Sequence, residues 1–151
     1  MIIKPYDLKN NLKTKTSVYL LYGQNSDLID EIINKDIKTF FSKNSYTYEE
    51  TEVLSDTNKF VIGLFNKSFF ENEKLIIINR VSDKILELIK DILKKENNDF
   101  KLILKAGILE KKSKLWSFFE KNKDLIIVPF YEDNYQTLLS LAQNYLNENK
   151  I

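Results

Sequence analysis

Near its N-terminus the chain reads Ser17-Val18-Tyr19-Leu20-Leu21-Tyr22-Gly23-Gln24-Asn25-Ser26. Residues 17–22 are mostly β-branched, aromatic or aliphatic, which predicts a strand in the core of a sheet. Gly23 closes this strand, and Ser26 is a good residue to cap a following helix. A buried strand, a glycine turn and a helix together form the first unit of a parallel α/β fold.

The same alternation of strand and helix continues along the chain. Further strands are predicted at 47–53, Lys74–Asn79, Phe100–Lys105 and 125–128, with Pro129 ending the last one. Helical spacing of apolar residues predicts helices from Ser26 to about 41, from Asp56 to about 66, from Ser82 to about 96, over 112–121 and from Asp133 onward. Five strands alternating with helices predict a five-stranded parallel sheet with helices on both faces.

Two of the predicted helices carry signals of their own. The first has one apolar face, made of Leu28, Ile29, Ile32, Ile33, Ile37, Phe40 and Phe41. In the last, Asp133 and Gln136 have the spacing of a capping box, which predicts the start of a helix.

Composition restricts the chemistry that the chain can perform. The 151 residues are 43% hydrophobic and 30% charged, which fits one globular domain. The chain has neither cysteine nor histidine, which excludes disulfides, thiolate nucleophiles and imidazole groups. Lys and Arg number 23 against 22 Asp and Glu, so the chain lacks the basic excess of a dedicated DNA-binding domain. No apolar run is long enough to span a membrane, so we expect a cytoplasmic protein with no membrane partner.

The turn after the first strand does not match a phosphate-binding loop. Such a loop reads G-x-x-x-x-G-K-[ST], in which the glycines admit the phosphates and the lysine neutralises them. Gly23 is present, but Leu28, Ile29 and Asp30 stand at the positions of the second glycine, the lysine and the hydroxyl residue. Because isoleucine cannot neutralise a phosphate and aspartate repels one, we expect Gly23 only to form the turn. The sequence therefore predicts no catalytic residue, no cofactor and no metal.

Two charged clusters could still form sites. Glu49, Glu50 and Glu52 lie on the weak strand 47–53, but only Glu50 and Glu52 would share one of its faces. A hard cation needs several converging oxygens, so we interpret the cluster as a solvated edge.

A second cluster is basic. Lysines surround the predicted helix 112–121, where basic residues near aromatic ones can indicate nucleic-acid contact. At helical spacing we expect Trp116 and Phe119 in the core and the lysines in solvent. The lysines are Lys111, Lys112, Lys114, Lys121 and Lys123.

Two adjacent aromatic residues stand between the second predicted helix and strand Lys74–Asn79. Phe69 and Phe70 come too late for the buried stripe that Leu64 and Phe65 complete, and too early for the strand. Exposed aromatic pairs at such a junction are typical of anchors for a partner, and buried ones belong to the core. The residues alone leave both interpretations open.

Five stretches follow one another in the order and spacing of a known family: 18–23, 68–70 with 74–78, 102–104, 109–115 and 129–131. In these motifs the chain resembles the delta subunit of the bacterial sliding-clamp loader, part of the DNA polymerase III holoenzyme. The resemblance covers nearly the whole chain. It implies that residues 1–151 form one AAA+-like N-terminal clamp-binding domain without a functional phosphate loop, and that a lid domain begins near 133–151.

The resemblance also implies a site. The family binds the ring-shaped sliding clamp, and holds one interface open for loading onto primed DNA, by inserting an apolar pair that follows a small or polar residue. These positions correspond here to Ser68, Phe69 and Phe70. The first apolar residue is phenylalanine where the family has leucine, and Phe65 stands where some members have glutamine, which puts an auxiliary polar contact in doubt.

Under this interpretation the domain is not catalytic, and its partners are the sliding clamp and the other loader subunits. DNA is reached only through the assembly, and DNA-directed DNA polymerase activity belongs to the parent assembly. Two alternatives remain open: a degenerate nucleotide-binding domain with a cryptic NTP site, and a nucleic-acid-binding domain that uses the lysines of 111–123.

Overall fold

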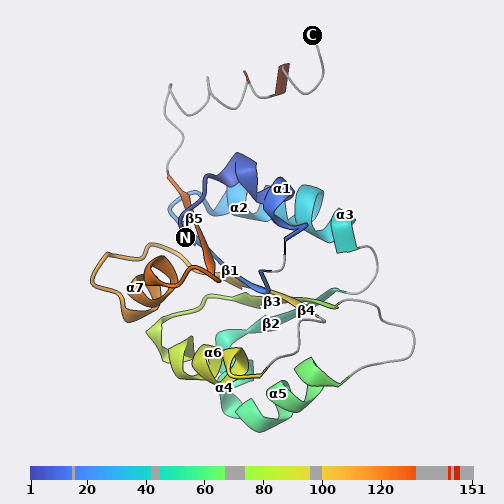
Figure 1. Cartoon of the computed structure of the whole chain (residues 1–151), viewed down its shortest axis with the longest axis vertical. Helices are drawn as coiled ribbons and strands as arrows, with labels where there is room; N and C mark the ends of the chain where they lie inside the picture. The colour runs from blue at the N-terminus through green and yellow to red at the C-terminus, as the bar shows by residue number, and fades with distance from the viewer. Residues whose placement is uncertain are drawn as a thin grey trace.

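The structure is a computed structural model that describes residues 1–14, 16–41, 45–66, 74–95, 100–131, 143, 145 and 146. Its centre is a five-stranded sheet in the order β2-β3-β4-β1-β5, in which all neighbours are parallel. The strands are β1 (Val18–Gly23), β2 (Ser45–Glu49), β3 (Lys74–Asn79), β4 (Phe100–Lys105) and β5 (Ile126–Phe130). Helices lie on both faces (Figure 1), so the predicted fold class is confirmed.

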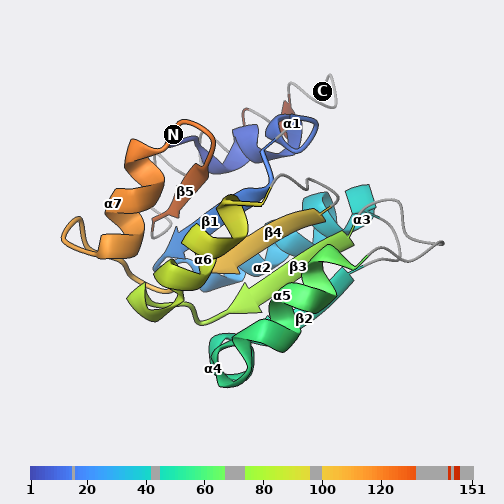
Figure 2. The same cartoon turned by 60° about the horizontal axis from the view of Figure 1, so that its bottom comes forward.

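Each face of the sheet has its own layer of helices (Figures 1 and 2). One layer contains the turn Pro5–Asp7, α1 (Leu8–Asn11), α2 (Ser26–Ile32), the π-helical stretch Ile33–Ile37 and α3 (Lys38–Phe41). The other contains α4 (Glu50–Ser55), α5 (Thr57–Phe65), α6 (Leu86–Leu93) with its 3-10 start Asp83–Ile85, and α7 (Lys114–Lys121).

The central strands are buried on both faces because both layers pack on them. In β1, Val18 and Leu20 belong to the core under α5, α6 and α7, whereas Tyr19 and Leu21 belong to the core under α1 and α2. All four side chains are fully buried. The alternation along one strand thus fills two separate apolar cores, which explains why the strand reads as a continuous apolar run.

The connection from β1 to β2 crosses one face of the sheet, and the connections after β2, β3 and β4 cross the other. The chain therefore leaves the neighbouring strands β1 and β4 on opposite faces. In open parallel sheets, ligands bind in the crevice at the carboxyl ends of such a strand pair. The carboxyl ends of β1 and β4 are therefore the place where this fold favours a ligand site.

Three predicted boundaries are wrong. The strand predicted at 47–53 ends at Glu49, because Glu49 and Glu52 form a reciprocal capping box that begins α4 at Glu50. Asn25, rather than Ser26, caps α2, since its side chain accepts from the Leu28 N–H at 3.1 Å.

Pro129 lies inside β5 rather than after it. It pairs with Tyr22 of β1, and β5 is the last strand of the sheet order. Proline is tolerated on an edge strand because its missing N–H can face away from the ladder.

Of the predicted C-terminal helix, the structure describes Gln143, Tyr145 and Leu146, which are helical. Tyr145 and Leu146 are exposed. Phe40 is exposed as well, although its helical periodicity predicts a place on the buried face of its helix. The predicted helix start at Asp133 and Gln136 lies outside the described residues, and the division into a core and a lid stays a prediction.

Candidate functional site

Gly23 forms the turn at the carboxyl end of β1. Its φ of +130° is unfavourable for any other residue, and a Cβ there would lie 2.0 Å from the Phe130 carbonyl oxygen. Its N–H donates to the Gly107 carbonyl at 3.0 Å, and the Asn25 N–H donates to the Phe130 carbonyl at 3.3 Å. The turn is therefore tied to the ends of β4 and β5, in agreement with the structural role predicted for Gly23.

The backbone N–H groups that follow in this turn donate hydrogen bonds to acceptors in the turn itself. The Ser26 N–H donates to the Gln24 carbonyl at 3.1 Å, and the Ile29 N–H donates to the Asn25 carbonyl at 3.1 Å. The Leu28 N–H donates to the Asn25 side chain at 3.1 Å. A phosphate-binding loop directs such amides at the phosphate oxygens. Here they hold the start of α2 instead.

An ion pair lies near the carboxyl end of β4. The ammonium of Lys105, the last residue of β4, contacts the carboxylate of Asp30 on α2. Asp30 stands where a phosphate loop has its hydroxyl residue, and Ile29, at the lysine position, is fully buried in the core. The charge of the Lys105 ammonium is thus balanced by the Asp30 carboxylate.

A hydrogen bond between two aromatic side chains lies at the carboxyl end of β1. The Trp116 Nε1–H donates to the Tyr22 hydroxyl at 3.0 Å. Burial raises the pKa of the Tyr22 hydroxyl, and the hydrogen bond from Trp116 offsets part of that rise. Tyr22 is therefore a neutral phenol at pH 7, which fits a structural role better than that of a base. Phe119 is fully buried as predicted, whereas Trp116 is half-buried against the core.

The interpretation of Glu50 as a solvated residue is wrong. Glu50 is only 8% exposed, because it lies on a helix rather than on a strand edge. Its carboxylate accepts from the Ser82 N–H at 2.8 Å and from the Ser82 hydroxyl at 3.0 Å. Glu50 thus joins α4 to the residue that caps the 3-10 start of α6, as a structural acceptor.

The other two glutamates of this cluster also have partners. Glu49 accepts from Arg80 at 3.0 and 2.6 Å in a two-point contact, and Arg80 has a positive φ of 54° just after β3. Glu52 accepts from the Glu49 N–H at 3.2 Å. Within the described part of the chain, no three acidic side chains are grouped to hold a metal ion.

Ser68, Phe69 and Phe70 lie outside the described residues, but both flanks of their segment are described. Leu64 is buried, and the Phe65 ring packs edge-on against Phe100 at 5.4 Å between centroids. The Lys74 ammonium donates to the Gly63 carbonyl at 3.0 Å and to the Asn66 carbonyl at 2.5 Å. Lys74 therefore ties the C-terminal end of α5 to the start of β3.

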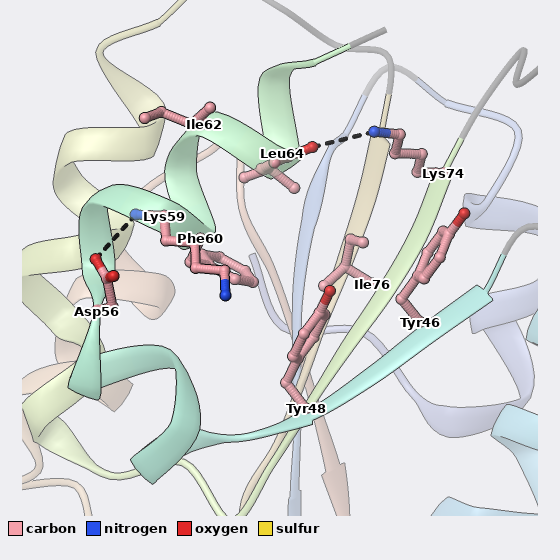
Figure 3. Close-up of a pocket in the computed structure, with 10 residues that line it drawn as sticks. Tyr46, Tyr48, Asp56, Lys59, Phe60, Ile62, Leu64, Lys74 and Ile76 are labelled. Atoms are coloured by element: carbon pink, nitrogen blue, oxygen red, sulfur yellow. Dashed lines mark hydrogen bonds between the residues drawn. The ribbon is translucent and has the colours of Figure 1, made fainter. Parts of the chain in front are cut away.

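A pocket of about 550 Å³ opens next to these flanks, between α5 and the edge strand β2 (Figure 3). Tyr48 and Phe60 form part of its wall and pack edge-on at 5.6 Å. Tyr46 and Ile62 line its mouth and are 41% and 70% exposed. Apolar surface is thus exposed beside the segment where the aromatic pair is predicted.

The five lysines predicted to face solvent around α7 are all exposed. Four of them, Lys112, Lys114, Lys121 and Lys123, line a second hollow together with Lys90 of α6. The sequence alone does not identify Lys90, because only the sheet order places α6 beside α7. None of the helices in the described residues is long and apolar enough to cross a membrane.

No protein-family model and no curated protein sequence matches the chain. Among solved structures, its fold is similar to that of the DNA clamp loader delta protein (YqeN) of Bacillus subtilis, with a TM-score of 0.73 and 16% sequence identity. The match covers 96% of this chain and 48% of that protein, so the chain spans about half the length of the solved structure. At this identity the likeness establishes a shared fold.

Proposed function

We propose that this chain is a non-catalytic, AAA+-like domain of a clamp-loader subunit that binds the sliding clamp and helps to open the ring. The observation that carries the proposal is the fold, which over 96% of the chain is similar to that of a DNA clamp loader delta protein. The five sequence stretches that resemble the delta family add independent support, since they lie in the family's order. Residues 1–151 form the clamp-binding domain, with a lid domain beginning near 133–151.

A role without nucleotide chemistry fits the contacts at the carboxyl ends of β1 and β4. The amides of Ser26, Leu28 and Ile29 hold the turn and the start of α2, and Lys105 is paired with Asp30. A P-loop enzyme needs both amides and a free cation at this place. In the assembly, the nucleotide chemistry therefore belongs to other loader subunits.

The proposed clamp-binding element is Ser68, Phe69 and Phe70, in the segment that joins α5 to β3. Its flanks are fixed to the domain, because Lys74 bonds two carbonyls at the end of α5 and Phe65 packs on Phe100. Because both flanks are attached to the domain, a contact made by this element would transmit force to the domain. Two phenylalanine side chains would fill an apolar pocket on the clamp.

Ring opening requires no chemistry in this domain. A protein that binds the open ring more tightly than the closed ring shifts the equilibrium by the difference in its two affinities. The partners are the sliding clamp and the other loader subunits, DNA is reached through that assembly, and the complex acts in the cytoplasm during replication.

Size-exclusion chromatography of the chain with the sliding clamp of its own organism tests the proposal. We expect the two proteins to elute together, and a mixture with bovine serum albumin to elute as separate components. Specific interfaces of standard size have dissociation constants of about 1 µM or lower. Separate elution of chain and clamp at concentrations of about 10 µM would therefore contradict the proposal.

A further inference from the structure

A basic groove of about 730 Å³ runs between α6 and α7, which lie side by side on one face of the sheet (Figures 1 and 2). None of the described residues that line it is acidic. Five of them are lysines, although the whole chain has a net charge of only +1. The lysines of this α6–α7 groove are Lys90, Lys112, Lys114, Lys121 and Lys123.

The floor of the groove is apolar. Leu86 and Phe118 line it, and Phe118 is half-buried with its ring edge-on to Phe119 at 6.3 Å. The Lys90 ammonium lies 5.6 Å from the centre of the Phe118 ring. An apolar side chain that enters the groove would meet Phe118, Leu86 and the methylene stems of the lysines, with ammonium groups around it.

Two of the lysines have weak partners outside the groove. Lys90 lies 3.5 Å from Glu87, and Lys112 lies 3.0 Å from Glu110, but all four side chains are well exposed. Exposed ion pairs contribute little, so these lysines can exchange their partners for a ligand at small cost.

The surrounding carboxylates limit the length of an anionic ligand. Glu87, Glu110, Glu120 and Asp124 each stand within three residues of a groove lysine, yet none of them lines the groove. A nucleic-acid strand that covers a binding site several nucleotides long would continue past the lysines toward these acidic groups. A short acidic peptide, by contrast, can place all its negative charge against the groove lysines without reaching these acidic groups.

We propose that the α6–α7 groove binds a short acidic peptide segment of a partner protein, which places an aromatic or large aliphatic side chain on Phe118 and Leu86 and its carboxylates against the lysines. The basic rim gives charge complementarity and sets the rate of encounter, and the apolar floor supplies an anchor. None of the described residues that line the groove belongs to the proposed clamp-binding segment, so the test of the groove does not depend on that proposal.

The test measures fluorescence anisotropy of a labelled peptide, rich in aspartate and glutamate around one phenylalanine, on titration with the full chain. The double variant Lys114→Glu and Lys121→Glu reverses two groove charges. The double variant Lys9→Glu and Lys13→Glu changes net charge equally on exposed lysines at α1, on the opposite face of the sheet. Circular dichroism of both variants checks that they are folded.

We expect the groove variant to weaken peptide binding by about tenfold or more, and the α1 variant to change it by less than about twofold. A peptide with alanine in place of its phenylalanine should bind more weakly than the original by about fivefold or more.

Three results would overturn the proposal. If the original peptide does not bind, the groove is not a peptide site. If both variants weaken binding equally, the attraction comes from net charge alone. If labelled oligo-thymidine of equal charge binds the wild-type chain more tightly than the peptide and loses this binding in the groove variant, the groove is a nucleic-acid site.

Discussion

The carboxylate of Asp83, at the start of α6, accepts a hydrogen bond of 2.6 Å from the hydroxyl of Ser113, at the start of α7. The same carboxylate accepts from the backbone N–H of Leu115 at 3.1 Å and of Lys114 at 3.2 Å. One acidic side chain thus caps a helix that follows it by about thirty residues. Both helices border the α6–α7 groove. This contact therefore holds the N-terminal ends of the two helices together.

Removal of this shared cap should destabilise the domain. The hydrogen bond from Ser113 and then that from the Leu115 amide hold the pKa of Asp83 below its usual value. A lowered pKa means that the stabilisation is complete above the usual aspartate range and is lost as the pH falls through the folded-state value. We expect Asp83→Ala to lower the free energy of unfolding by about 0.5–2 kcal/mol at pH 7, measured by urea denaturation.

The difference between wild type and Asp83→Ala should shrink as the pH falls below about 3.9. Asp91→Ala is the control, since Asp91 is exposed and lies 3.9 Å from Lys94. It should change stability by less than about 0.5 kcal/mol. A loss in Asp83→Ala that stays constant down to acid pH would show that the carboxylate charge is not involved.

Replacement by alanine should change the stability of the domain in opposite directions at Gly23 and at Gly63. Gly23→Ala forces a Cβ to within 2.0 Å of the Phe130 carbonyl oxygen at a positive φ, so we expect a loss of at least about 1–2 kcal/mol. Gly63 lies inside α5, and open space surrounds the position that an alanine Cβ would take, so Gly63→Ala should gain about 0.5–1 kcal/mol. Thermal unfolding of both variants is the measurement, and equal shifts would contradict the tight turn at Gly23.

Glu50 is predicted to be a structural residue. Glu50→Ala leaves the Ser82 N–H without its acceptor, which should cost about 1–3 kcal/mol in urea denaturation. Glu87→Ala removes an exposed carboxylate 3.5 Å from Lys90 and should change stability by less than about 1 kcal/mol. If both variants were equally stable, Glu50 would have no such role.

The domain should not bind ATP. The turn amides and Lys105 have internal partners, so a triphosphate would have to displace them. Isothermal titration with Mg-ATP should give no heat of binding at micromolar concentrations, and phosphate release should equal that of a buffer blank. Binding at micromolar concentrations, or turnover above the blank, would contradict this prediction.

Strong periodic signals predict the fold correctly from sequence. Lys74–Asn79 and Phe100–Lys105 have the predicted bounds, since short runs rich in isoleucine and leucine favour strands covered on both faces. The prediction of a strand over 47–53 is wrong at its end because the alternation of Glu50 and Glu52 with the β-branched residues Thr51 and Val53 resembles an edge strand. The capping box of Glu49 and Glu52 overrides that pattern.

Contacts between distant elements cannot be predicted from sequence. The pairing of Lys105 with Asp30 and the placement of Lys90 beside α7 follow from the order of the strands, which local patterns do not contain. The turn Pro5–Asp7 and α1 escape prediction because Leu8 and Leu12 alone make too short a pattern, although both are fully buried or nearly so.

The most direct test of the proposed function compares wild type with the double variant Phe69→Ala and Phe70→Ala. Burial of one phenylalanine stabilises a complex by about 1.5–3 kcal/mol, so loss of both should weaken clamp binding by about two to four orders of magnitude in isothermal titration. Ile108→Ala is the control, because Ile108 is 68% exposed and lies beyond the carboxyl end of β4, whereas Lys74 lies at the amino end of β3.

We expect the control to bind the clamp as the wild type does, and the double variant to keep the wild-type melting temperature, since an anchor is exposed in the free domain. If the two phenylalanines belonged to the core, each replacement would cost about 3–5 kcal/mol of folding stability. A double variant that binds the clamp with unchanged affinity, or one whose melting temperature falls steeply, would contradict the clamp-binding role of this pair.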